Sequence, residues 1–137
     1  MHRFLIPALL LAAMPAKADM YFDAAQVAYS SAADASCTPR LRSITTRDIG
    51  NEIWLQYENQ TANWLAFQGT ITFSGNGVPA RSIIFATNNT RPPGNGVVRI
   101  VGVSPALPST IPGAQVTVRV TYCSASRPPS GPPRNIY

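Results

Sequence analysis

The strongest constraint on the fold is the stretch 115–123, where polar and apolar residues alternate strictly. Val116, Val118, Val120 and Tyr122 recur at every second position, with polar residues between them. A period of two predicts an extended strand that turns one face to the core and the other to solvent. We therefore expect a half-buried antiparallel strand that ends on a cysteine.

Apolar runs between Gly, Pro and Asn turns indicate further strands. Residues 52–58 and 64–73 alternate in the same way, and the polar turn between them predicts an antiparallel hairpin. Asn76-Gly77 predicts a tight hairpin turn. The other expected strands cover residues 40–46 with a bulge, 81–87, and 97–103, the last apolar on both sides and so expected near a sheet centre.

About six or seven short strands predict an all-β domain over residues 37–126, a single immunoglobulin-like antiparallel β-sandwich with one disulfide. A small OB-like barrel is the alternative. No tryptophan has the spacing to the cysteines found in antibody domains. "Immunoglobulin-like" therefore refers to architecture alone.

Residues 1–18 have the pattern of a secretory signal peptide. A basic start precedes an apolar run over residues 4–14, and residues 16–18 have the small-x-small pattern of a cleavage site. The run is shorter than the roughly 20 residues that span a bilayer, so no transmembrane segment is expected. We expect an exported protein, either periplasmic or extracellular.

Two segments flank the predicted sandwich. In residues 19–36 the apolar positions fit both helix and strand periods, so a strand, a short helix and an extended arm all stay open. Residues 127–137 contain four prolines and predict an extended tail. The tail is either a plain terminus or a docking arm, with Arg127, Arg134 and Tyr137 as its candidate contacts.

Cys37 and Cys123 form an even pair in a chain with an export signal, which predicts a disulfide. The pair is separated by 86 residues (123 − 37). In the chain-entropy model, closing a loop of that size stabilises a domain by about 4 to 5 kcal/mol. No CxxC motif favours redox or metal chemistry instead.

The residue inventory argues against catalysis. Beyond residue 18 the chain has no histidine and no lysine, which removes the usual general bases and histidine metal ligands. We expect no enzyme, no cofactor and no metal site. Nine arginines and six acids remain, a net charge of +3 (9 − 6), which is too weak for a nucleic-acid-binding surface.

Two tryptophans are the candidate binding residues. Trp54 shares its strand side with Gln56, and Trp64 shares its side with Gln68. Because residues 52–58 and 64–73 are expected to form a hairpin, these four side chains should project together from its polar face. Such a face suits a sugar ring or a protein partner.

These observations favour an exported, non-catalytic sandwich that acts in cell-envelope or surface assembly, through protein partners or self-assembly. The first alternative is a periplasmic or secreted module that binds a glycan or peptide through the tryptophan face. A further alternative is a chaperone-like or inhibitor domain.

Overall fold

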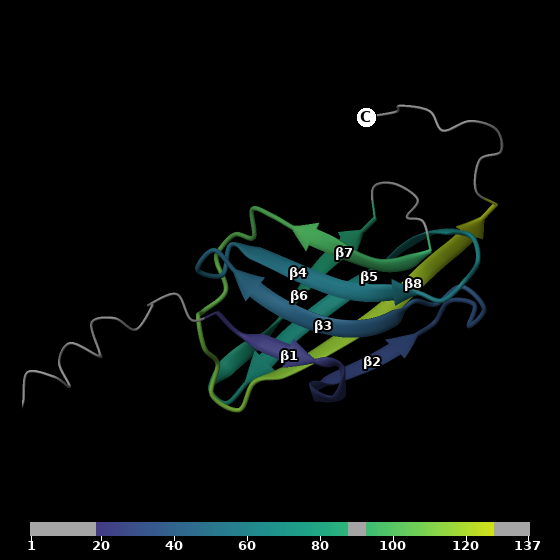
Figure 1. Cartoon of the computed structure of the whole chain (residues 1–137). Helices are drawn as coiled ribbons and strands as arrows, with labels where there is room; N and C mark the ends of the chain where they lie inside the picture. Colours follow the sequence, from purple (N-terminus) through teal and green to yellow (C-terminus); the bar gives the residue numbers. More distant parts are fainter. Residues whose placement is uncertain (1–18, 88–92, 128–137) are drawn as a thin grey trace, which may run out of the picture.

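The computed structural model describes residues 19–87 and 93–127. In chain order the elements are β1 (Tyr21–Asp23), the 3-10 helix η1 (Ala24–Gln26), β2 (Val27–Ser31), β3 (Arg40–Arg47), β4 (Glu52–Asn59), β5 (Trp64–Gly75), β6 (Val78–Ala86), β7 (Gly94–Ile100) and β8 (Gln115–Ser126). The strands form two four-stranded sheets, ordered β1-β3-β4-β7 and β2-β8-β5-β6, which pack face to face (Figure 1). The predicted β-sandwich with one disulfide is confirmed.

The N-terminal segment, whose state the sequence leaves open, supplies one strand to each sheet. β1 pairs with β3, η1 turns the chain, and β2 pairs with β8. Asp23 caps η1 by accepting hydrogen bonds from the amides of Ala25 and Gln26 at 3.0 and 3.2 Å. Met20, Phe22 and Val27 are buried in the common core.

Three details of the topology differ from the prediction. Residues 37–126 contribute six strands as expected, and the N-terminal segment raises the described total to eight. The β2–β8 pair is parallel, whereas the other strand pairs are antiparallel. The first two strands lie in different sheets here, whereas strands A and B are neighbours in the A-B-E-D sheet of immunoglobulin domains, so the likeness is one of architecture.

The predicted hairpin between residues 52–58 and 64–73 is wrong. β4 belongs to the first sheet and β5 to the second, so the turn between them crosses from one sheet to the other. A turn within one sheet and a turn between two sheets can have the same polar composition, so the sequence pattern does not distinguish them. The strand expected near a sheet centre, β7, lies at an edge.

A β-bulge corrects the prediction that Tyr122 belongs to the core. Val116, Val118 and Val120 are buried as expected, but the register between β5 and β8 shifts between Gln68 and Gly69. The extra residue on β8 reverses the alternation beyond Val120. Tyr122 is consequently 53% exposed, and Cys123 packs against the core.

The loop between β7 and β8 closes one end of the sandwich. Its residues Val103, Leu107 and Ile111 are buried. The amides of Val103 and Leu107 donate 2.9 Å hydrogen bonds to the carbonyls of Asn51 and Gly50 in the β3–β4 turn. These bonds fix the loop against the turn.

Candidate functional site

Trp54 lies on the outer face of the first sheet, in a row that crosses all four strands. In register it faces Thr45 on β3 and Arg99 on β7, and Thr45 in turn faces Tyr21 on β1. The sequence neighbours of Trp54 are buried, so alternation along β4 directs the indole outward as predicted. The row contains one exposed tyrosine, one half-buried tryptophan and one exposed arginine.

The Trp54 side chain is engaged by its own neighbours. Its indole Nε1 donates to Oε2 of Glu52 at 2.5 Å, and Arg99 donates to the same oxygen at 2.6 and 2.9 Å. The guanidinium carbons of Arg47 and Arg99 lie 4.1 and 5.2 Å from the ring centroid, within cation–π distance. These hydrogen bonds lower the pKa of Glu52, and the bond from Trp54 has the largest effect. The ring on which a sugar would stack is therefore already in contact with two cations.

Gln56 lies next to a shallow groove on the same outer face. The groove has a volume of about 320 Å³, and Arg42, Asn95 and Gly96 also line it. Arg42 lies 3.8 Å from the carboxylate of Glu58, so the cation at the groove is already paired.

Trp64 and Gln68 lie on the outer face of the opposite sheet. Both belong to β5, where the alternate residues are buried, and they pair with Ser126 and Tyr122 on β8. Tyr122 therefore stands beside Gln68 on that face because of the bulge. Since β4 and β5 are in different sheets, the four predicted residues do not form one binding face.

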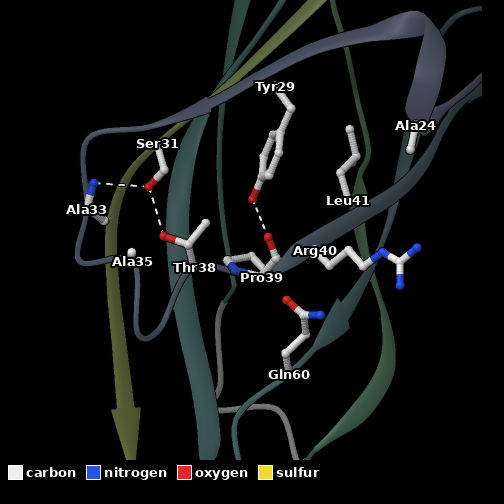
Figure 2. A pocket seen from close by; sticks show the side chains of 10 residues that line it. All are labelled: Ala24, Tyr29, Ser31, Ala33, Ala35, Thr38, Pro39, Arg40, Leu41 and Gln60. Carbon is white, nitrogen blue, oxygen red and sulfur yellow. Dashed lines mark hydrogen bonds between the residues drawn. The ribbon is translucent and has the colours of Figure 1, made fainter.

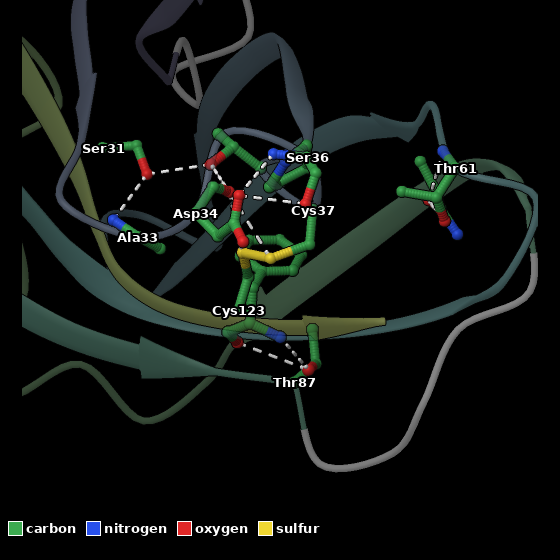
Figure 3. Close-up of a disulfide and its surroundings, with 12 residues drawn as sticks. Ser31, Ala33, Asp34, Ser36, Cys37, Thr61, Thr87 and Cys123 are labelled. Carbon is green, nitrogen blue, oxygen red and sulfur yellow. Dashed lines mark hydrogen bonds between the residues drawn. A yellow bond between two sulfur atoms is a disulfide. The ribbon is translucent and has the colours of Figure 1, made fainter. Parts of the chain in front are cut away.

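The disulfide joins the loop before β3 to the last strand (Figure 3). The Cα atoms of Cys37 and Cys123 are 5.9 Å apart, within the range usual for disulfides. Asp34 organises the loop: its Oδ1 accepts hydrogen bonds from the amide and hydroxyl of Ser36, both at 2.9 Å. These bonds lower the pKa of Asp34. The bridge has the structural role predicted for it.

A larger groove of about 530 Å³ opens beside β2 and β3 (Figure 2). Tyr29 forms part of its wall, and the Tyr29 hydroxyl donates a 2.5 Å hydrogen bond to the carbonyl of Pro39. Burial raises the pKa of Tyr29 to about 12. Arg40 is the charged residue of the lining, and it lies 3.6 Å from Glu58. The groove is thus walled mainly by small and apolar side chains.

The feature that the sequence analysis missed is the free edge of β6. β6 ends the second sheet, and among residues 19–87 and 93–127 it pairs with β5 alone. Ile84 projects from this edge strand and is 79% exposed, the highest exposure among the large apolar side chains described. The run Ile-Ile-Phe at 83–85 was a signal for this surface, because consecutive apolar residues in a strand cannot all face the core.

Arg127 of the predicted docking tail is exposed at the end of the last described segment. Arg134 and Tyr137 lie outside the described residues, as does the predicted signal peptide. Within residues 19–87 and 93–127, no helix has the length and apolarity to cross a membrane. The same residues hold no group of three or more acidic, cysteine or histidine side chains that suits a metal ion.

No family model, curated protein or solved structure matches this chain.

Proposed function

We propose that this protein is exported and non-catalytic, and that it acts in assembly at the cell envelope or cell surface through protein–protein contacts. The observation that carries the proposal is the free edge of β6. An edge strand presents unpaired backbone groups to another chain, and proteins that avoid such pairing place charges, prolines or covering segments there. β6 has one proline and one charge in its first half, Pro79 and Arg81, but from Ser82 to Ala86 it has neither, and Ile84 is exposed.

The disulfide and a buried residue next to the predicted cleavage site support export. A bridge across 86 residues persists in an oxidising compartment. Met20, two residues after the predicted cleavage site, is buried, and its amide donates a 2.9 Å hydrogen bond to the hydroxyl of Thr46. Cleavage after residue 18 would keep this core residue in the exported chain.

The absence of catalysis rests on the residue inventory. With no histidine or lysine beyond residue 18, the six carboxylates are the candidate acids and bases. Glu52 is held by Trp54 and Arg99, and Asp34 accepts hydrogen bonds in a turn. Both have lowered pKa values, and a carboxyl group of that kind is a poor proton donor near neutral pH.

Site-specific photocrosslinking in the producing cell tests the proposal. A photoreactive amino acid replaces Ile84 in one variant and Ser30 in a matched control. Ser30 lies at the opposite edge of the same cross-strand row, which runs through Arg119 and Thr70 to Ile84. We expect position 84 to give a defined adduct with a second copy or with a cell-envelope protein, and position 30 to give none. Equal labelling, or no adduct from either position, contradicts the proposal.

The glycan-binding alternative loses its main support. It required Trp54 and Trp64 on one face, and they lie on opposite outer faces of the sandwich.

A further inference from the structure

The backbone of β6 offers alternate hydrogen-bonding groups at its free edge. The amide of Thr87 donates a 2.9 Å bond to the carbonyl of Phe67, so this residue pair is hydrogen-bonded. In an antiparallel ladder hydrogen-bonded and non-bonded pairs alternate. The N–H and C=O groups of Ser82, Ile84 and Ala86 therefore point away from β5, toward the free edge.

We propose that a second copy of this chain occupies this edge, with the two β6 strands antiparallel around a two-fold axis at Ile84. This inference rests on the proposed function and names the partner. In that register Ile84 pairs with Ile84 of the second copy, and Ser82 pairs with Ala86. All three are residues whose backbone groups point outward, so each pair exchanges hydrogen bonds in both directions.

The side chains fit the same register. Ile84 pairs with Thr70 and projects on the same outer face of the sheet. In the dimer the two Ile84 side chains therefore meet on that face and lose their exposure to water. Arg81 falls opposite Thr87 of the second copy, and no like charges face each other directly. Pro79 lies outside the paired residues. The result is a symmetric, isologous contact, the commonest kind in homodimers.

The other edges suit such a contact less well. β1 has three residues and β2 has five. In β2 the Ser31 hydroxyl is engaged with Thr38 and with the amide of Ala33, which folds the following loop back over that end. β7 begins Gly-Asn-Gly and carries the charged Arg99 near its end, whereas the proline and the charge of β6, Pro79 and Arg81, precede the stretch from Ser82 to Ala86.

Ser82→Pro tests the contact directly. Proline removes an N–H that points away from β5, so the β5–β6 ladder keeps its hydrogen bonds while the proposed dimer loses two symmetry-related bonds. Ser82→Ala is the matched control, because it removes only the 2.8 Å hydroxyl contact with Thr72. We expect the wild type and Ser82→Ala to dimerise reversibly, and Ser82→Pro to raise the dissociation constant at least about tenfold.

The measurement is the average molar mass in solution, determined by light scattering over a concentration series. The series extends to about 1 mM, because a single strand pair is a small interface. Ile84→Lys is the second variant, in case Ser82→Pro fails to fold. It places like charges opposite each other and should give a monomer, whereas Tyr122→Lys, on the same outer face but away from the edge, should stay dimeric.

A wild type that is monomeric throughout, or a folded Ser82→Pro with the affinity of Ser82→Ala, overturns the dimer. The two proposals fail separately. A monomeric wild type whose position 84 crosslinks to a different envelope protein removes the self-pairing and leaves the assembly role standing.

Discussion

The amide of Leu107 donates a 2.9 Å hydrogen bond to the carbonyl of Gly50, and a β-carbon built on Gly50 would lie 1.9 Å from the carbonyl oxygen of Leu107. The β3–β4 turn and the β7–β8 loop therefore meet backbone to backbone. Gly50 also has a φ of +82°, a conformation that side chains disfavour.

Gly50→Ala should lower the free energy of unfolding by at least about 3 kcal/mol, because the backbone clash adds to the conformational cost. Gly77→Ala is the matched control. Gly77 also has a positive φ, +73°, but no atom lies within 4 Å of its added β-carbon. The control should lose only about 1 to 2 kcal/mol in urea unfolding. Equal losses in the two variants would show that the contact with Leu107 has no energetic effect.

Ile49→Asn should raise the stability of the domain by about 1 kcal/mol. Ile49 has a φ of +55° and is 67% exposed, so a β-branched side chain sits in the left-handed region with little burial to offset the strain. Asparagine tolerates that region better. Ile49→Val keeps the β-branch and should give no gain in thermal unfolding. A loss of stability in Ile49→Asn would contradict the backbone strain inferred at Ile49.

Reduction of the Cys37–Cys123 bridge should lower the melting temperature by more than about 10 °C, given a stabilisation of about 4 kcal/mol for a loop of this length. Calorimetry with and without reductant measures the shift. The double Cys→Ser variant should melt like the reduced protein and should not respond to reductant. Two reactive thiols in the denatured, non-reduced protein would refute the bridge.

Tryptophan fluorescence should report the protonation of Glu52. A folded-state pKa below the unfolded value means that this carboxylate stabilises the fold above the unfolded pKa, and that the contribution is lost as the pH falls through the folded pKa. In a Trp64→Phe background, the emission of Trp54 should change with a midpoint below the ordinary value of 4.5. Glu52→Gln should remove the transition. A midpoint at or above 4.5 would contradict the hydrogen bonding seen here.

Local patterns predicted the six strands of residues 37–126 and most of their buried faces, but left the state of residues 19–36 open. Leu41 and Ile44 have mismatched parity in the sequence, and a bulge between Leu41 and Ser43 accounts for it as expected. These features depend on side-chain alternation within one strand, which the sequence carries directly.

Pairing between strands was harder to predict, and the candidate site depended on it. The outward direction of Trp54 and Trp64 follows from their own strands, but their separation onto two sheets follows from where the chain crosses after Asn59. The bulge that exposes Tyr122 leaves no mark in the alternation of residues 115–123. It is set by the partner strand.

The parallel pairing of β2 with β8 determines when the fold can be completed. Val27 faces Val116, 89 residues later in the chain (116 − 27). Ladders between such distant segments give a high contact order, and closing the intervening loop costs entropy before any contact forms. A chain made from its N-terminus must therefore keep β2 unpaired until nearly all of the domain has been synthesised. The second sheet is completed last, and folding is expected to be slow relative to helical domains of the same size.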